Sequence, residues 1–203
     1  MHQNILSKKQ NDLLPLIKEF NSSYGLVGGI AIALQIGHRQ SVDFDLFTEA
    51  DINQDLIRKK IKKLNLKIDH LIIESRQEFS LVINQIKITF YQFPFPLEFE
   101  KKINGWINLP NLETLGAMKA FALGKRNVWR DYVDLFFIFK EIGVDKVIHQ
   151  AKIIFGGEFN LKFFKAQLIY YQDLEYQPLD FMPGYKQSNQ TMKNYLEKIS
   201  LSL

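Results

Sequence analysis

The chain has 203 residues, of which 46% are hydrophobic and 24% charged, and its formal net charge is +4. That length suits one large domain or one domain with a helical extension, and the composition argues against extended disorder. The absence of cysteine excludes disulfides and thiolate metal sites and fits a reducing cytoplasm. No signal-peptide pattern and no apolar run of the roughly 20 residues that a membrane helix needs is visible, so we expect a cytoplasmic protein.

The positive charge indicates either a mild preference for anionic partners or simply a Lys-rich solvated surface. Lys and Arg are densest over residues 58–63. Apolar residues interrupt this run at helical spacing, namely Leu56, Ile57, Ile61 and Leu64. The stretch therefore predicts the solvated face of an amphipathic helix before it predicts a nucleic-acid patch.

The first half of the chain mixes helix and strand patterns. A short apolar run that stops at a double glycine predicts a strand entering a tight turn, followed by a buried helix. Residues 41–47 alternate apolar and polar side chains, which predicts a half-buried strand whose polar side faces a cleft. In chain order we expect helices over 13–20, 30–36 and 52–64, and strands over 24–27, 41–47, 67–74, 78–83 and 86–93.

The second half is mostly helical. Pro94 and Pro96 end the sheet region, because proline cannot donate to a strand ladder. Asn111 suits the N-cap of the first later helix. The expected helices cover 111–125, 128–141, 144–155, 160–172 and 190–199. The sequence thus predicts an α+β fold, with a mixed sheet and flanking helices over residues 1–108 and a helical domain over residues 109–203.

Asp43 and Asp45 are the first candidates for chemistry. Residues two apart on a strand point to the same face, so these carboxylates project side by side, about 6–7 Å apart. Mg²⁺ prefers one or two carboxylates together with substrate phosphate oxygens. Taken alone, an Asp-x-Asp pattern is weak evidence for a metal site, because it more often marks two solvated acids on an edge strand.

Gly28 and Gly29 supply a second signal. A double glycine after a short strand lets backbone N–H groups approach a phosphate, and the N-terminus of the following helix adds partial positive charge. An ordinary turn is the alternative. The order of strand, double glycine, buried helix and acidic strand brings both signals to one end of the sheet.

With these residues the sequence resembles the AbiEii/AbiGii-type nucleotidyltransferase toxins, which belong to the DNA polymerase β-like nucleotidyltransferase superfamily. The resemblance covers about residues 13–141. Its first signature spans residues 28–34, 37–39 and 41–47. Its second signature is the helical pattern formed by Lys119, Ala122, Arg126 and residues 130–135.

The resemblance implies roles for individual residues. Gly28 and Gly29 would hold the triphosphate of an NTP, and Asp43 and Asp45 would bind Mg²⁺ as catalytic residues. Lys119 would be a catalytic cation that reaches the phosphates or the base. The family further implies transfer of a nucleoside monophosphate from an NTP, with tRNA as the acceptor in toxin members, and an antitoxin as partner.

Other residues near the two signatures carry open alternatives. Lys119 and Arg126 lie seven apart and share a helix face, which suits a polyphosphate. Arg39 and Ser41 are candidate nucleotide contacts, although Arg39 can equally orient an Asp and Ser41 can hydrogen-bond Asp43. His38 reads as a hydrogen-bonded structural residue. For Asp131 and Asp134 we favour structural roles, with Asp134 pairing with Arg126 or Arg130.

One position departs from the wider superfamily, whose catalytic members carry a third carboxylate on a later strand. The best positional match here is Thr89, which is neither a strong metal ligand nor a base. Asp69, Glu74 or Glu78 could substitute if the strand order brings one of them near. Loss of the base would cost about 10²- to 10⁴-fold in rate.

The leading hypothesis is a Mg²⁺-dependent nucleotidyltransferase of the toxin or phage-defence type, which moves NMP from an NTP to a hydroxyl of a tRNA-like RNA or of a protein. The alternative is a degenerate nucleotidyltransferase fold that acts as a nucleotide-binding or protein-interaction module. The reason for this alternative is that Thr89 occupies the position where a third carboxylate is expected.

Overall fold

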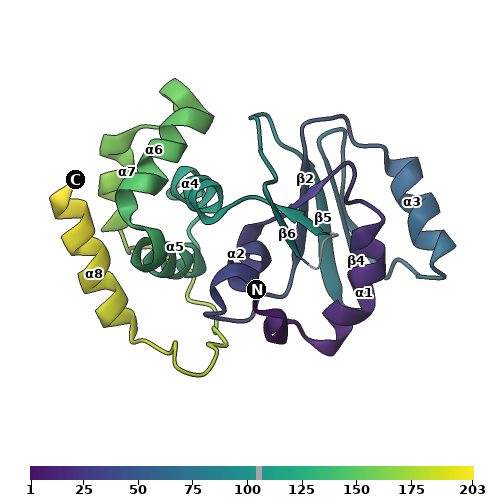
Figure 1. Ribbon diagram of the computed structural model, residues 1–203, viewed down its shortest axis with the longest axis horizontal. Coiled ribbons are helices and arrows are strands. Elements are labelled where there is room, and N and C mark those ends of the chain that lie inside the picture. The colour runs from purple at the N-terminus through teal and green to yellow at the C-terminus, as the bar shows by residue number, and fades with distance from the viewer. Residues whose placement is uncertain (104–106) are drawn as a thin grey trace. The chain divides into compact units, whose positions relative to one another are not determined.

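The computed structural model describes residues 1–103 and 107–203 (Figure 1). These residues form two compact units. Unit 1 consists of residues 1–35 and 41–111, and unit 2 consists of residues 36–40 and 112–203. The helical unit therefore takes in a short segment, residues 36–40, which the expected boundary at residue 108 leaves in the first half.

Unit 1 is built on a five-stranded mixed sheet in the order β1-β2-β5-β4-β3. Strands β2 and β5 pair in parallel, and the other neighbours are antiparallel. The predicted fold class, a mixed sheet with flanking helices, is confirmed. The strands are β1 (Gly25–Val27), β2 (Phe44–Thr48), β3 (His70–Glu74), β4 (Glu78–Ile83) and β5 (Ile86–Gln92).

The two faces of this sheet differ in chemistry. On one face Leu46 is registered with Phe90, and Phe90 with Phe79, and all three are buried. Three helices of unit 1 supply apolar side chains to the core, and Figure 1 shows α1 and α3 on one side of the sheet. They are α1 (Lys8–Lys18), α2 (Gly28–Ile36) and α3 (Gln54–Lys63). The opposite face carries the polar residues described below.

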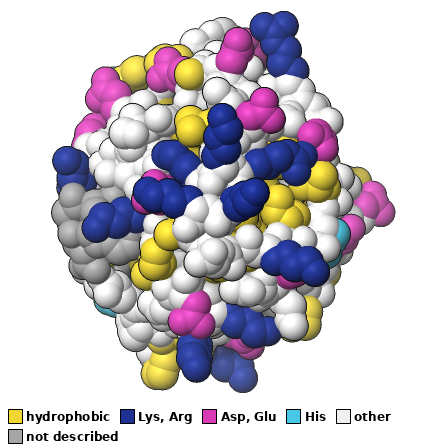
Figure 2. Space-filling view, turned by 90° about the vertical axis from the view of Figure 1, so that its right-hand side faces the viewer, with side chains coloured by type: hydrophobic (Ala, Val, Ile, Leu, Met, Phe, Trp, Pro, Cys, Tyr) yellow, Lys and Arg dark blue, Asp and Glu magenta, His cyan; other side chains and the backbone are white. Residues whose placement is uncertain are grey.

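Helices α1 and α3 follow from local sequence signals. Helix α1 begins five residues before the predicted start at residue 13, because Ser7 and Gln10 form a capping box that satisfies its first backbone N–H groups. In α3 the apolar positions Ile57 and Ile61 are buried, as the helical spacing predicts, whereas Leu56 is 45% exposed. Lys and Arg side chains gather on the face of the molecule to which α3 belongs (Figure 2).

A second, two-stranded sheet was not predicted. It pairs β6 (Lys101–Ile103) with β7 (Ile107–Leu109) in antiparallel fashion. The expectation that Pro94 and Pro96 end all strand structure is therefore wrong. Strands of three residues are too short to show a period of two, so the pattern carried no signal for them.

Unit 2 is helical. Its α-helices are α4 (Leu112–Ala122), α5 (Trp129–Ile142), α6 (Val144–Phe155), α7 (Leu161–Leu168) and α8 (Asn189–Ser202), and short 3₁₀ turns cover Gln3–Ile5 in unit 1 and Gly156–Glu158 in unit 2. Helix α5 forms the centre of the unit, since every residue from Asp131 to Phe139 is buried. Helix α7 ends four residues before the predicted residue 172. Within the described ranges, no helix is both long and apolar enough to cross a membrane.

Candidate active site

The acidic strand begins later than the alternation predicts. Strand β2 starts at Phe44, so Asp43 lies just before it, and Val42 is 57% exposed instead of facing the core. The segment before the strand is held by hydrogen bonds from the side chain of Gln10 and not by backbone pairing with another strand. Gln10 Nε2 donates to the carbonyl oxygens of Ser41 at 2.6 Å and of Val42 at 3.0 Å.

Gln10 is a positioning residue that the functional interpretation of the sequence missed. Its side chain is only 2% exposed, and its Oε1 accepts a hydrogen bond from Ser7 N at 2.9 Å. The same amide thus caps α1 and fixes the backbone that leads into Asp43. The Ser-x-x-Gln pattern at residues 7–10 was the available signal, since it is a capping-box sequence.

The double glycine and the acidic strand meet at one point. Val27 is registered with Asp45 across the β1–β2 pair, and Gly28 follows directly at the start of α2. Gly28 has φ +73°, and a Cβ built on it would lie 2.2 Å from Asp45 Oδ2. Only glycine fits here, because both the backbone conformation and the nearby carboxylate exclude a side chain. The carboxylate of Asp45 therefore lies at the N-terminal end of α2.

Thr89 lies beside Asp45, as its position in the sequence predicts. The two residues are registered partners in the parallel β2–β5 pair. Of the three acids that could substitute for a third carboxylate, only Glu78 lies on this face, two residues from Ser80, which is the registered partner of Thr89. Glu74 pairs with Arg58 of α3 at 2.7 Å, and Asp69 accepts from Gln85 N at 3.1 Å.

A buried charge network occupies unit 2. Asp134 is fully buried and has three basic neighbours. Arg39 holds it with two parallel bonds, Nε to Oδ1 at 2.8 Å and Nη2 to Oδ2 at 2.9 Å. Lys119 Nζ lies 2.7 Å from Oδ2, and His38 Nε2 lies 2.9 Å from Oδ1. The expected pairing of Asp134 with Arg126 or Arg130 is replaced by these contacts.

Asp131 completes the network. Its Oδ1 accepts from Lys119 Nζ at 2.5 Å and from Arg126 Nη2 at 2.9 Å, and its Oδ2 accepts from Arg126 Nε at 2.6 Å. Lys119 thus lies between the carboxylates of Asp131 and Asp134. Its side chain is only 6% exposed, whereas that of Arg126 is 55% exposed.

The protonation states follow from this arrangement. Burial alone raises the pKa of Asp131 and Asp134, but the adjacent cations outweigh it and hold both pKa values below the ordinary range. Burial lowers the pKa of His38 despite its bond to Asp134, so the imidazole is neutral. A neutral ring that donates from Nε2 leaves Nδ1 as the bare nitrogen, and this buried atom has no partner among the described residues.

The predicted site residues therefore fall into two groups. Gly28, Gly29, Ser41, Asp43 and Asp45 belong to unit 1, whereas Arg39, Lys119 and Arg126 belong to unit 2. Gly28 and Asp45 are brought into direct contact. Arg39 orients an Asp, which was one of its two expected roles, and that Asp is Asp134.

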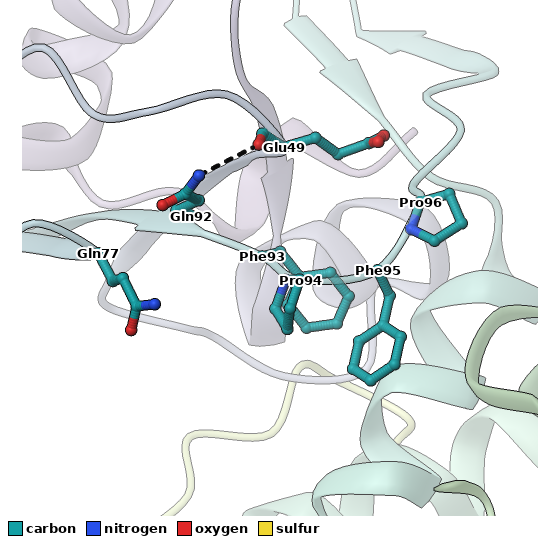
Figure 3. Close-up of a pocket in the computed structure, with 7 residues that line it drawn as sticks. All are labelled: Glu49, Gln77, Gln92, Phe93, Pro94, Phe95 and Pro96. Atoms are coloured by element: carbon teal, nitrogen blue, oxygen red, sulfur yellow. Dashed lines mark hydrogen bonds between the residues drawn. The ribbon is translucent and has the colours of Figure 1, made fainter. Parts of the chain in front are cut away.

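A separate pocket of about 330 Å³ lies beyond the carboxyl ends of β2 and β5. Figure 3 shows the amide side chains of Gln77 and Gln92 on one side and the rings of Phe95 and Pro96 on the other. Gln92 Nε2 donates to the backbone oxygen of Glu49 at 3.4 Å. Asp45 lies four residues before Glu49, or about 13 Å along an extended strand, so this pocket is distinct from the acidic site.

The polar face of the sheet suits a divalent cation with a phosphate ligand better than a metal held by protein alone. Among the described residues, no three His, Cys, Asp or Glu side chains are grouped as a preformed metal site. Asp43 and Asp45 nevertheless offer two carboxylates at the N-terminal end of β2. Mg²⁺ is usually bound by one or two carboxylates plus substrate phosphates, so the donor set fits that ion.

Comparison with known proteins gives four similarities. The model of the family described as "Nucleotidyl transferase AbiEii toxin, Type IV TA system" matches residues 18–158. An uncharacterized protein of Aquifex aeolicus is 26% identical over 205 residues, covering 95% of this chain and 98% of that protein. A crystal structure of a proposed nucleotidyltransferase from H. pylori has TM-score 0.63 at 17% identity, covering 97% and 95% of the two chains. The nucleotidyltransferase toxin MenT4 from Mycobacterium tuberculosis H37Rv has TM-score 0.57 at 12% identity, covering 96% and 82%.

Proposed function

The chain belongs to the AbiEii nucleotidyl transferase toxin family, and on that premise we propose that it transfers a nucleoside monophosphate from an NTP to a hydroxyl group in a Mg²⁺-dependent reaction. The acceptor is an RNA of the tRNA type or a protein. The observation that carries the proposal is the contact between Gly28 and Asp45, because it joins a glycine turn at a helix N-terminus to an acidic strand.

Asp43 and Asp45 are the proposed metal ligands and catalytic residues. A bound Mg²⁺ would neutralise the triphosphate and stabilise the charge that develops on the transferred phosphoryl group. Gln10 fixes the backbone before Asp43 through the carbonyls of Ser41 and Val42. The backbone that leads into Asp43 is thereby held in place before the substrate arrives, which limits the entropy cost of binding.

Gly28, Gly29 and Ser41 are the proposed phosphate contacts of unit 1. The N-terminus of α2 offers backbone N–H groups and partial positive charge, which attract a polyphosphate. The missing side chain of Gly28 lets a ligand approach the backbone next to Asp45. Ser41 contributes a hydroxyl two residues before Asp43.

Lys119 and Arg126 are the proposed nucleotide contacts of unit 2. Arg126 is the more accessible of the two, because its side chain is 55% exposed. Lys119 would exchange one of its two carboxylate partners for a nucleotide anion, which makes it a switchable catalytic cation. Arg39 is bound to Asp134 through two bonds, so we assign it the task of keeping that carboxylate in place.

The direct test is nucleotidyl transfer with the whole chain. Each of the four labelled NTPs is incubated with the protein, Mg²⁺ and either total tRNA or a cell lysate. We expect one NTP to label an acceptor, and we expect labelling to vanish in Asp43→Ala/Asp45→Ala. Glu74→Gln is the matched control. It removes a carboxylate from the same unit, but one that pairs with Arg58 of α3 on the other face of the sheet. Equal, background labelling by wild type and the double variant would refute the proposal.

One observation favours a second function, a nucleotide-binding or protein-interaction module without turnover. Thr89 is the registered neighbour of Asp45, where a third carboxylate would complete the site. Calorimetry with Mg²⁺ and NTP separates the two functions: binding without any transfer supports the module, and efficient transfer excludes it.

The family description names a toxin–antitoxin system, so we also propose a cognate antitoxin as partner. Induced expression of the chain alone is expected to slow growth, and Asp45→Asn is expected to abolish that effect. If the inactive variant slowed growth as strongly as wild type, toxicity would not depend on nucleotidyl transfer.

A further inference from the structure

Four aromatic rings form a strip that begins next to the acidic site. Phe47 lies two residues after Asp45 on β2 and shares its face, and Phe47 is the registered partner of Tyr91 on β5. The ring centroids of Phe47 and Tyr91 are 5.0 Å apart. The ring of Phe93 lies 5.4 Å from that of Phe47 and 5.5 Å from that of Phe95. These four residues, here called the aromatic strip, are all partly exposed.

The strip ends at the pocket beyond the carboxyl ends of β2 and β5, which Phe93 and Phe95 line together with Glu49, Gln77 and Gln92 (Figure 3). Gln92 N donates to the backbone oxygen of Gln77 at 2.9 Å, so the side chains of these paired residues leave the sheet on the face opposite to the strip. The pocket therefore lies at the end of the sheet, with rings on one side and amides on the other. Its volume of about 330 Å³ is near the lower end of the range for ligand pockets, roughly 300–1,000 Å³, and suits one planar group.

Three polar side chains at the pocket have hydrogen-bonding capacity to spare. Among residues 1–103 and 107–203, the side-chain amide of Gln77 makes no hydrogen bond, and Gln92 uses only its Nε2, which donates to Glu49 O and to Asp51 Oδ1 at 3.1 Å. Glu49 Oε1 accepts from Leu97 N at 3.2 Å, which leaves its other carboxylate oxygen for a ligand. The pocket thus offers acceptors from Glu49 and Gln92, and both a donor and an acceptor from Gln77.

A nucleobase matches this combination of rings and polar groups. Single-stranded RNA is recognised by stacking of its bases on aromatic side chains and by hydrogen bonds to the base edges. Adenine and cytosine carry an exocyclic amino group, which donates to the oxygen of a carboxylate or an amide. The acids Glu49 and Asp51 repel phosphates, so they suit the base of such a strand and not its backbone. An apolar peptide segment would leave the polar groups of the pocket unpaired, which costs free energy.

We propose that the aromatic strip and the pocket at its end form a base-binding site for a single-stranded RNA acceptor, and that the pocket prefers adenine or cytosine. This inference rests on the proposed function and deepens it, because it assigns a site on this chain to the RNA form of the acceptor. Glu49 at the pocket lies about 13 Å from Asp45 along β2, a distance that a few stacked nucleotides span at about 3.4 Å each. Bases on the strip thus hold the strand while its reactive hydroxyl lies at Asp45.

The test measures binding of short labelled RNA strands to the whole chain by fluorescence anisotropy. The probes are homopolymers of adenosine, cytidine and uridine. We expect wild type to bind the adenosine and cytidine strands about fivefold or more tightly than the uridine strand. Phe95→Ala is expected to weaken binding of the adenosine strand about fivefold or more, which is the effect of losing one stacked base. Phe163→Ala is the matched control, because it removes a partly exposed Phe from α7 of unit 2.

Glu49→Gln tests the preference of the pocket. The three strands have the same phosphates, so the loss of one negative charge changes their affinities alike. The preference for cytidine over uridine is expected to fall below about twofold, because the new amide donates as well as accepts. Gln77→Ala adds a variant that does not endanger the fold, since this side chain is exposed. It is expected to weaken binding of the adenosine strand by about twofold or more.

The outcomes separate this inference from the proposed function. If wild type binds the three strands equally and Phe95→Ala binds them as wild type does, the base-binding site is refuted, and nucleotidyl transfer is judged by its own assay. If the strands bind as expected but no NTP labels any acceptor, the proposed function fails and the base-binding site stands. If a protein is the only acceptor that is labelled and no strand binds, the site is refuted and the transferase activity stands. Unchanged thermal unfolding of Phe95→Ala and Gln77→Ala excludes misfolding as the cause of weaker binding.

Discussion

Two short acidic motifs, Asp43-x-Asp45 and Asp131-x-x-Asp134, have opposite environments. Asp43 and Asp45 are partly exposed at the start of β2, and Asp45 lies on the polar face of the sheet. Asp131 and Asp134 are buried in α5 and are matched by cations of their own unit. The difference teaches that an acid's role depends on its burial. Buried carboxylates that are paired with Arg and Lys hold a fold together, whereas partly exposed carboxylates can bind a cation from solution.

The largest effect on stability is expected from Asp134→Asn. The substitution leaves Arg39 and Lys119 buried with one compensating charge fewer, and breaking a buried pair costs about 3–5 kcal/mol. Chemical denaturation of wild type and variant measures the loss in free energy of unfolding. Asp43→Asn is the matched control and should change stability by less than about 1 kcal/mol. If both variants lost the same free energy of unfolding, the two motifs would not differ in their contribution to stability.

Gly28→Ala tests whether the close approach of Gly28 to Asp45 matters for activity. A non-glycine residue at positive φ costs roughly 1–2 kcal/mol, and here the added methyl also collides with the carboxylate of Asp45. We expect a loss of that size in the free energy of unfolding. We also expect transfer activity to fall tenfold or more. Gly184→Ala also places an alanine at positive φ, +85°, but its Cβ meets nothing within 4 Å. Equal activity in the two variants would show that the contact with Asp45 does not matter.

Gln10→Ala is expected to have a smaller effect. It removes two hydrogen bonds to the backbone before Asp43 and should cost about 1–2 kcal/mol of stability, together with a measurable rise in KM for the NTP. The control is Gln35→Ala, which also removes a side-chain bond to backbone, at Pro110 O. A change in stability without any change in KM would mean that Gln10 only caps α1.

The pH dependence of stability gives the smallest effect near neutrality. The folded pKa of His38 is below its ordinary 6.5, so the unfolded chain binds the extra proton and stability declines as the pH falls below about 6.5. The folded pKa values of Asp131 and Asp134 are also lowered, so their contribution is complete above the ordinary 3.8 and is lost below it. Denaturation between pH 8 and pH 3 should show both declines, with a shallower acid slope in Asp134→Asn. If wild type and Asp134→Asn had equal acid slopes, the buried network would not contribute to the pH dependence of stability.

Local patterns predicted the elements that carry the site, and pairing across the chain supplied the rest. The alternation within β4 and the helical periodicity of α6 matched the observed bounds, because both are ordinary, well-patterned elements. The pairs of Arg39 with Asp134 and of Ser80 with Thr89 could not be predicted in the same way. One joins residues far apart in sequence, and the other depends on strand register, which periodicity does not specify.

The most direct test of the central claim is calorimetric titration with Mg²⁺ and a non-hydrolysable analogue of the NTP that labels best. The account predicts that wild type binds the analogue at least tenfold more tightly with Mg²⁺ than without it. It predicts that Asp43→Asn/Asp45→Asn, although folded, loses this dependence on Mg²⁺. Mg²⁺-dependent binding that is equally tight in the double variant would contradict the assignment of Asp43 and Asp45 as the metal-binding edge of the site.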